Sequence, residues 1–447
     1  MRRRRRGPLP GRVRHRPQRA GVADRVEARR RLPAGGAGAG AGRRRLPADR
    51  GRLPRADGPD PLRPRPRGTR RARPRDLAPR GRSARLARPV TASPASPAAA
   101  ATEYGIFLPI GNGGWIMSET APHPRATYAY NREAALTADR LGLDFVMSMA
   151  KWRGYGGRTD HWGETLESMT MMSALAEATQ RVKVWATVHT NLFHPALVAK
   201  MFATLDQVSD GRCGMNVVVG AYEHEFSQMG QWRSDFSHDD RYRYTEEWLH
   251  LVQRLWSEDS VTAHGEFFTL DDCQSRPHPS RRPTLVSAGR SEAGLRFQAA
   301  HCDGSFLTAE DLPGLRAAGE HVKALAAERG RSLRTYAMLT VVLDETDAAA
   351  EARFREHGRG YDAEAITNMK LSWGLPLDRA MSMTAGDEAH EAFQTAVVVG
   401  GPASVAEQVL THVHETGLDG LMLIFPDYLQ DLPAFGELVL PTLRAES

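Results

Sequence analysis

The chain lacks the features that mark a secreted disulfide framework, a metal protein or a membrane span. Its 447 residues include three cysteines, Cys213, Cys273 and Cys302, whose spacing fits no metal site and which cannot all pair with one another. No apolar run approaches the roughly 18 residues that a membrane-spanning helix needs. We therefore expect reduced thiols in a cytoplasmic protein with no membrane segment and no metal site.

The first hundred residues contain no Phe, Trp, Tyr, Ile, Cys or Lys. They hold 30 Arg and 6 acidic residues, a net charge of +24, whereas residues 101–447 hold 30 basic and 47 acidic residues, a net charge of −17. A segment this poor in apolar side chains cannot bury enough surface to offset the entropy of ordering it. We expect residues 1–102 to be a disordered, Arg/Pro/Gly/Ala-rich extension before a domain of residues 103–447.

Four interpretations of this extension remain open. It is a basic arm for nucleic acid or anionic membrane, a targeting peptide, an unstructured tail, or sequence translated from upstream of the true start codon. The last fits the GC-rich codons of Arg, Pro, Gly and Ala and the absence of Lys. The lack of interleaved aromatic residues argues against nucleic-acid binding, and the lack of an apolar stretch after MRRRRR argues against a secretion signal.

Apolar runs alternate with helical patterns along residues 103–447. The strands that we expect number eight, at residues 105–111, 143–150, 182–188, 211–222, 283–289, 303–308, 335–346 and 418–426. Eight such units predict an α/β fold, a (β/α)₈ TIM barrel with insertions, which include a hairpin strand at 265–270 and a helical and loop stretch at 347–400. A doubly wound open sheet is the alternative, weakened because no G-x-G-x-x-G follows the first strand.

In such a barrel the active site lies where the strands end. The corresponding residues are Asn112, Ala150–Lys151, Thr187–His189, Asn216–Tyr222, Ser287–Ser291 and Phe425–Pro426. Asn216 is a polar amide in an apolar strand, so it either satisfies nearby backbone or faces a ligand. His189 is a candidate acid or base, and Glu223 and Glu225 place acids beside the same mouth.

Small residues in SAGRSEAG come before a helix for which Ser291 is a suitable N-cap, which is typical of a phosphate site. Arg241 and Tyr242 begin another helix and can both bind phosphate. The alternative for Ser291 is that it only caps the helix. The alternative for Arg241 and Tyr242 is an ordinary solvated helix start with salt bridges to Asp239 or Glu246. Because no G-x-S-x-G and no Walker loop is present, we expect a barrel enzyme with a phosphate-bearing organic cofactor and redox chemistry.

Motifs along the whole of residues 103–447 resemble the bacterial luciferase-like, flavin-dependent monooxygenases, and within them most closely the pyrimidine-oxidising branch. These motifs, in chain order, are GIFLPIGNGGW, LDFVMSMAKWRGYGG, HWGETLESMTMMSALA, DGRCGMNVVVG, EFSQMGQW, DDRYRYTEEW, AGRSEAG and DYLQDLPAFGELVLP. The resemblance implies a TIM barrel, usually a homo-oligomer, that uses O₂ and FMN reduced by a separate flavin reductase.

Residue by residue, the resemblance implies FMN contacts at Ala150, Lys151, Asn216, Glu225, Arg241, Tyr242 and Ser291. Thr187 and Asn216 match the positions that hold O₂ near the flavin, and His189 joins them as a catalytic candidate. The chemistry implied is attack of a flavin peroxide on C4 of uracil or thymine, or of a related cyclic amide, with cleavage of the C–N amide bond.

Two departures concern the substrate side. Ala221 stands where the pyrimidine enzymes carry Trp, and VHTNLFHP introduces His189 and Asn191. The pair His194–Pro195 is similar to the branch that attacks chelators and sulfones. The alternatives are therefore the same flavin chemistry on another small C–N, C–S or halogenated substrate, of the alkanesulfonate, chelator or sulfone type, or a flavin-binding protein without turnover.

Overall fold

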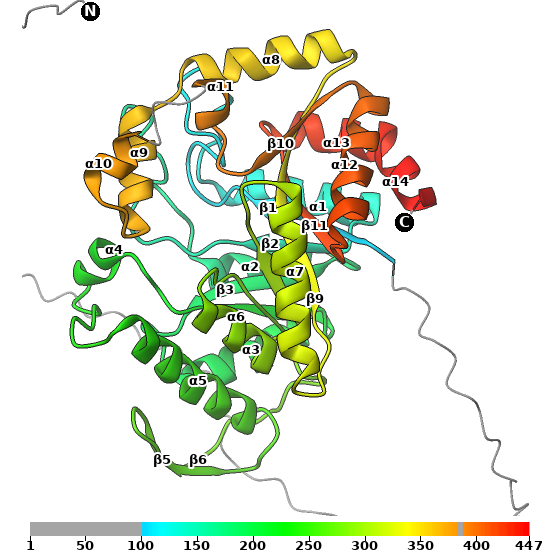
Figure 1. Cartoon of the computed structure of the whole chain (residues 1–447). Helices are drawn as coiled ribbons and strands as arrows, with labels where there is room; N and C mark the ends of the chain where they lie inside the picture. The colour runs from blue at the N-terminus through cyan, green and yellow to red at the C-terminus, as the bar shows by residue number, and fades with distance from the viewer. Residues whose placement is uncertain (1–100, 383–387, 447) are drawn as a thin grey trace, which may run out of the picture. The chain divides into compact units, whose positions relative to one another are not determined.

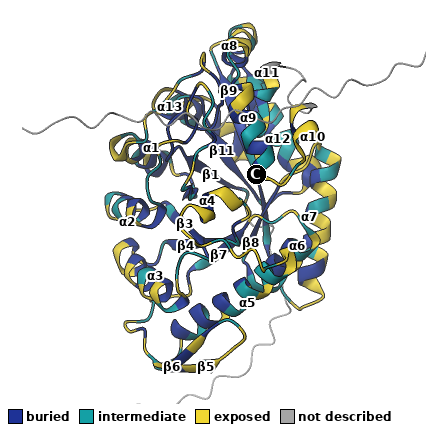
Figure 2. Ribbon diagram, turned by 90° about the vertical axis from the view of Figure 1, so that its left-hand side faces the viewer, coloured by how far each residue is buried: buried dark blue, intermediate teal, exposed yellow. Residues whose placement is uncertain are grey.

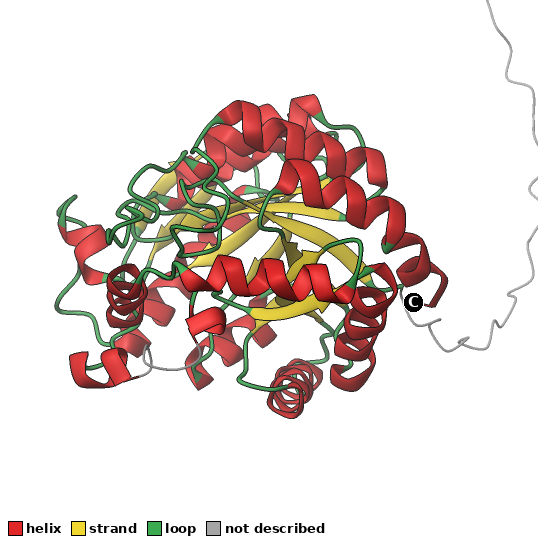
Figure 3. Cartoon of the chain, turned by 90° about the horizontal axis from the view of Figure 1, so that it is seen from above, coloured by secondary structure: helices red, strands yellow, loops and turns green. Residues whose placement is uncertain are grey.

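The computed structural model describes residues 101–382 and 388–446, so nearly all of the predicted disordered segment 1–102 lies outside the described residues. Eight parallel strands form a closed barrel (Figures 1 and 3): β1 (Glu103–Leu108), β2 (Phe145–Ser148), β3 (Lys183–His189), β4 (Cys213–Val218), β7 (Thr284–Ser287), β8 (Gly304–Leu307), β9 (Arg334–Leu343) and β11 (Gly420–Ile424). They follow one another in the sheet in the order β11, β1, β2, β3, β4, β7, β8, and β9 pairs with both β8 and β11. The predicted (β/α)₈ barrel is confirmed.

Helices cover the outside of the ring of strands (Figure 3): α1 (Tyr128–Leu141), α2 (Ser168–Ala178), α3 (Pro195–Ser209), α5 (His238–Leu255), α6 (Glu292–His301), α7 (Leu312–Ala327), α12 (Pro402–Thr416), α13 (Tyr428–Leu438) and α14 (Leu440–Glu446). Their inner faces are buried and their outer faces exposed (Figure 2). His194 begins α3 by accepting a hydrogen bond from the Ala196 amide at 3.3 Å, which is the helix-entry role of an N-cap. None of the helices in the described ranges is long and apolar enough to cross a membrane.

Two insertions differ from the sequence prediction. The antiparallel hairpin consists of β5 (Val261–His264) and β6 (Thr269–Cys273), so the predicted strand at 265–270 is mostly the turn. The stretch 347–400 contains α8 (Asp347–Arg359), α9 (Ala363–Ser372), α10 (Leu377–Ser382), α11 (Glu388–Glu391) and a strand that we did not predict, β10 (Ala396–Gly400). β10 forms because β9 is longer than β8: the first half of β9 pairs with β8, and the second half pairs with β10.

The cysteines make no disulfide among the described residues, and Cys213 and Cys302 are buried. Burial raises the pKa of the Cys213 thiol to about 12, and it raises that of Cys302 as well. Cys273, on the hairpin, is partly exposed. The buried pair behaves as small apolar side chains in the core.

A layer of aromatic rings opposite glycines fills the lower part of the barrel. Phe145 and Trp185 stack with ring centroids 4.2 Å apart, and Trp185 meets Tyr336 at 5.8 Å. Because β3 and β9 are not neighbours in the sheet, this last contact crosses the barrel interior. The strands beside these rings carry glycine: a Cβ on Gly105 would lie 2.4 Å from the Phe145 ring, and one on Gly214 would lie 2.4 Å from Trp185.

We predict that Gly214→Ala destabilises the protein, because its methyl group would overlap Trp185 in a packed layer. Overpacking of this kind costs about 1–3 kcal/mol of unfolding free energy. Gly319→Ala is the matched control, since the nearest atom would be 3.6 Å away in the middle of α7 and alanine favours helix. Urea unfolding should give a lower midpoint for Gly214→Ala alone. Equal midpoints for the two variants would contradict the packing argument.

Candidate active site

Thr187 and Asn216 form the next layer above the aromatic rings. Side chains alternate along a strand, so Thr187 faces the barrel interior like Trp185, and Asn216 like Gly214. The Asn216 Nδ2 donates to Thr187 Oγ1 at 2.9 Å, and Thr187 Oγ1 donates to the Ser148 carbonyl oxygen. Since the threonine proton is committed to Ser148, the amide nitrogen must face the threonine. The structure thus brings together the two residues that were predicted to hold O₂.

This arrangement leaves the Asn216 Oδ1 atom without a hydrogen-bond partner among the described residues. Thr187 and Asn216 are each 5% exposed, so the unused acceptor lies in an environment with little water. An unsatisfied buried carbonyl oxygen is costly unless a ligand donates a hydrogen bond to it. The pair therefore fits a ligand that presents an N–H group at the barrel mouth.

A buried ion pair stands beside this layer. The Lys151 Nζ lies 3.2 Å from Glu225 Oε2, and both side chains are less than 10% exposed. The second oxygen of Glu225 accepts from the Trp152 amide at 2.6 Å, and the rings of Tyr155 and Tyr222 lie 4.4 and 4.7 Å from the ammonium. A buried ion pair is tolerated when further contacts supplement it, and here the Trp152 amide and two aromatic rings do so.

The elements that carry this ion pair come from different parts of the chain. Lys151 follows Ala150 in the loop after β2, and Glu225 lies on the short helix α4 (Glu223–Ser227), in front of the ring of strands in Figure 2. The hydrogen bonds to Glu225 fasten α4 to the loop after β2. Glu223, the other acid considered, is exposed and lies outside this contact.

The residues predicted to bind an anion lie at the N-terminus of α6. Ser291 caps the helix by accepting from the Gly294 amide at 3.1 Å. The hydroxyl of Tyr242 reaches the same turn, where it would lie 2.7 Å from a Cβ on Gly289 and 2.6 Å from a Cβ on Gly294. Burial raises the pKa of Tyr242, and the contact with Ser291 acts in the opposite direction. The glycines of AGRSEAG thus allow α5 to bring Tyr242 against the start of α6.

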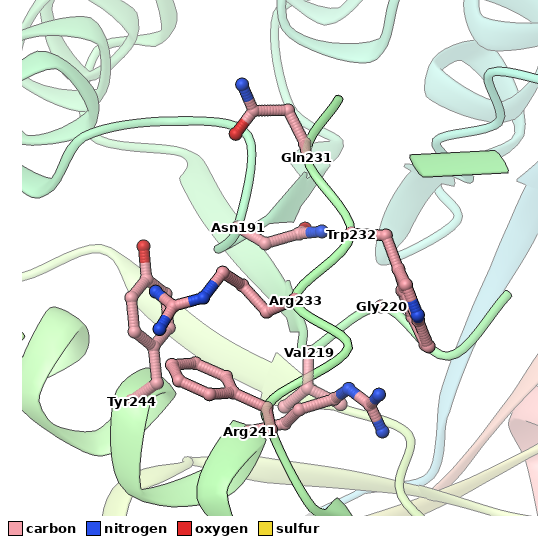
Figure 4. A pocket seen from close by; sticks show the side chains of 9 residues that line it. Asn191, Val219, Gly220, Gln231, Trp232, Arg233, Arg241 and Tyr244 are labelled. Atoms are coloured by element: carbon pink, nitrogen blue, oxygen red, sulfur yellow. The ribbon is translucent and has the colours of Figure 1, made fainter. Parts of the chain in front are cut away.

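Arg241 lies one residue away and has no carboxylate partner in the part of the chain that the structure describes. Asp239 pairs with His238 and Glu246 with His301, and neither of these two carboxylates pairs with Arg241. Its guanidinium lies 4.2 Å from the Trp232 ring and lines a pocket of about 100 Å³ (Figure 4). A guanidinium without a counter-charge is suited to bind a phosphate.

His189, at the end of β3, lies one step above Thr187 on the same face of the strand. Its Nδ1 accepts a hydrogen bond from the Trp152 Nε1 at 3.1 Å, and its ring packs edge-on against Phe226. Burial, with a smaller effect from Lys151, lowers the pKa of His189 to about 3. The imidazole is therefore neutral throughout the physiological pH range.

Two strand-end candidates have structural roles. Asn112 donates to the Asp160 carbonyl oxygen at 2.8 Å and accepts from the Glu164 amide at 2.9 Å, so both ends of its amide hold the loop after β2. Phe425 is buried against Tyr428 and Phe435. Sequence reasoning did not single out Trp152, Tyr155 or Trp232, and it included Tyr222 only as the end of a strand-end range. The available signal was the number of aromatic residues in polar loops at strand ends.

The insertion of residues 347–400 contacts the loops at the barrel mouth. Asp362 accepts from the Thr159 amide and hydroxyl at 2.7 and 2.8 Å, and Asn368 donates to the Tyr155 carbonyl oxygen at 2.8 Å. On the other side, Arg290 lies 5.5 Å from the ring of Trp373, just after α9. α9 therefore links the loop that carries Lys151 to the loop that begins α6. No group of three His, Cys, Asp or Glu side chains suited to hold a metal occurs within the described ranges.

Comparison with known proteins identifies the family of this chain. The model of the luciferase-like monooxygenase family matches residues 102–420. A pyrimidine monooxygenase RutA of Variovorax paradoxus is 36% identical over 348 residues, which cover 76% of this chain and 94% of the relative. That of Methylobacterium radiotolerans is 37% identical, with 78% and 93% covered.

Solved structures share the fold. A riboflavin lyase, RcaE, superimposes with a TM-score of 0.70 at 22% identity, covering 77% of this chain and 92% of that one. The long-chain alkane monooxygenase LadA does so with a TM-score of 0.68 at 20% identity, covering 77% and 91%. The family match and the identity to the curated relatives each span most of residues 102–447. The chain belongs to the luciferase-like monooxygenase family and is a flavin-dependent monooxygenase.

Proposed function

We propose that the protein uses reduced FMN and O₂ to cleave a C–N amide bond of uracil, thymine or a related cyclic amide. The observation that carries this proposal is the Thr187–Asn216 pair with its unused Oδ1 acceptor at the barrel mouth. The relatives named pyrimidine monooxygenase, of which the chain covers 94% in the first case, support the substrate class.

The residues that would hold FMN are Ala150, Lys151, Asn216, Glu225, Arg241, Tyr242 and Ser291. Their arrangement supports binding of both the phosphate group and the flavin ring of FMN. Arg241, Tyr242 and the start of α6 offer a phosphate one free guanidinium, one phenol and the positive end of a helix dipole. Asn216 Oδ1 offers an acceptor for an N–H of the flavin ring. When bound, FMN reduced by a separate flavin reductase supplies the electrons that activate O₂.

The chain's own contribution to the reaction is position and exclusion of water. We propose Thr187 and Asn216 as the catalytic pair, with His189 beside them toward the substrate. Both members of the pair are 5% exposed, and their hydrogen bonds fix their orientation before any ligand binds. Groups held in this way stabilise developing charge without having to reorganise, and a dry site protects reactive species from water. We expect the functional protein to be a homo-oligomer.

Two features favour a second candidate, the same chemistry on another C–N or C–S substrate. His189 places an imidazole at the mouth, and Ala221, which stands where the pyrimidine enzymes carry Trp, is exposed and leaves room for a larger molecule. Mass spectrometry of products from chemically reduced FMN, ¹⁸O₂ and a substrate panel separates the candidates.

In that assay we expect one ¹⁸O atom in a ring-opened product of uracil or thymine. Oxygenation of sulfones or chelators alone would replace the pyrimidine proposal with the second candidate. Hydrogen peroxide as the only product with every substrate would mean a flavin-binding protein without turnover. Free FMN without the protein is the control for uncatalysed oxidation.

Asn216→Ala should lower coupled oxygenation of the substrate by about two orders of magnitude, the size of effect that follows loss of one preorganised group. Thr187→Val should act in the same direction, because it removes the acceptor for Asn216. Thr190→Val is the matched control, since Thr190 follows on the same segment but bonds to Thr245. A fully active Asn216→Ala variant would refute the assignment of this pair.

Arg241→Ala should weaken FMN binding by about 10- to 100-fold, because a hydrogen bond to a charged group contributes about 1.5–3 kcal/mol. Riboflavin, which has no phosphate, should bind the variant as well as it binds the unchanged protein. Arg243→Ala is the matched control on the same helix, since Arg243 is exposed and paired with Asp240 and Glu266. Fluorescence quenching of the two flavins measures both affinities. Equal losses for FMN and riboflavin would contradict a phosphate role.

A further inference from the structure

The contact between Trp152 and His189 determines which nitrogen of the imidazole carries a proton. An indole N–H is a donor only, and it points at Nδ1 of His189 from 3.1 Å. Nδ1 must therefore present its lone pair. In a neutral imidazole the other nitrogen, Nε2, then carries the hydrogen.

The surroundings oppose the other two forms of the ring. The doubly protonated form would place an N–H against the indole N–H, and it would add a positive charge beside Lys151 in a site that is 6% exposed at His189. The tautomer with hydrogen on Nδ1 would create the same clash of two donors. Phe226, against the ring, offers no charge that would compensate the doubly protonated form.

Trp152 is itself held firmly enough to impose this choice. Its amide donates to Glu225 at 2.6 Å, its carbonyl oxygen accepts from Gln228 at 2.7 Å, and its ring lies 6.4 Å from that of Phe193. The backbone of Trp152 is thus held by the same carboxylate that pairs with Lys151. Lys151, Glu225 and His189 are consequently parts of one connected arrangement.

The Nε2–H of His189 makes no hydrogen bond within the described part of the chain. His189 lies on the face of β3 that carries Trp185 and Thr187, one step nearer the barrel mouth than Thr187. A donor at this position, one step along β3 from Thr187, is complementary to a carbonyl oxygen of a molecule bound at the mouth.

We propose that Trp152 locks His189 as a neutral Nε2–H donor, and that this donor binds a carbonyl oxygen of the amide substrate at the barrel mouth. The inference rests on the proposed function for the identity of that oxygen. It replaces the expectation of an acid or base at His189: the residue orients and polarises the carbonyl group and transfers no proton near neutral pH. Trp152 is the positioning residue.

The tautomer is tested by ¹⁵N–¹H correlation spectra of histidine side chains in the full chain, with His189→Gln identifying the signal. We expect an unprotonated Nδ1 and a protonated Nε2, unchanged from pH 5 to pH 8. Trp152→Phe removes the donor, so the pKa of His189 should rise and the two tautomers should mix. Trp373→Phe, an exposed tryptophan outside this contact, is the control and should leave the signal unchanged. Titration of His189 between pH 5 and 8 in the unchanged protein would overturn the proposal.

The ligand role is tested by the affinity for uracil in the FMN-loaded protein. His189→Gln retains an N–H donor and should bind uracil within a few-fold of the unchanged protein, whereas His189→Leu should bind about tenfold more weakly, in line with the loss of one hydrogen bond. FMN affinity should be equal in both variants. Equal uracil affinity in the two variants would refute the donor role. If the unchanged protein binds no uracil, the pyrimidine assignment fails, while the spectra still decide the state of His189.

Discussion

The packing of aromatic rings against glycines inside the barrel is the constraint on which the site depends. Phe145 and Trp185 occupy the space that side chains at Gly105 and Gly214 would need. Because interiors are close-packed, this layer fixes the spacing of β1 to β4 and leaves no room below the mouth. The next inward-facing residues, Thr187 and Asn216, meet directly above this layer. The layer that we propose to be catalytic is therefore set by packing in the layer beneath it.

Above that layer, the site is built by segments outside the strands. The loop after β2 brings Lys151 and Trp152, α4 brings Glu225, and α9 holds the same loop through Asp362. The buried carboxylate of Glu225, with a donor on each of its two oxygens, is stable where an unpaired one is not. The −17 charge of residues 101–447 thus coexists with a local positive charge at Arg241, whereas the charge of Lys151 is balanced by Glu225. This local charge, not the net charge, is what an anionic ligand meets.

Two groups of residues at the barrel mouth differ in the number of ligand-binding groups that they offer. On the phosphate side, Arg241, Tyr242 and Ser291 come from two helix starts that meet through glycines, and each offers a group that binds anions. On the side that we propose for the substrate, His189 accepts a hydrogen bond from Trp152 and would offer its Nε2–H. We propose that the first group holds the cofactor and that the second discriminates between substrates through one hydrogen bond.

Sequence alone determined the barrel, its eight strands and the residues at their ends, because alternating apolar periodicity and helix caps are local properties. Thr187, Asn216, Tyr242 and Ser291 could be found in this way. Tertiary structure alone decided the strand β10, which pairs with the half of β9 that extends beyond β8. It also decided the bond between Trp152 and His189, which lie 37 residues apart in the chain. The protonation state that we infer for His189 depends on that contact and on burial. Neither the contact nor the burial can be predicted from the residues next to His189 in the sequence.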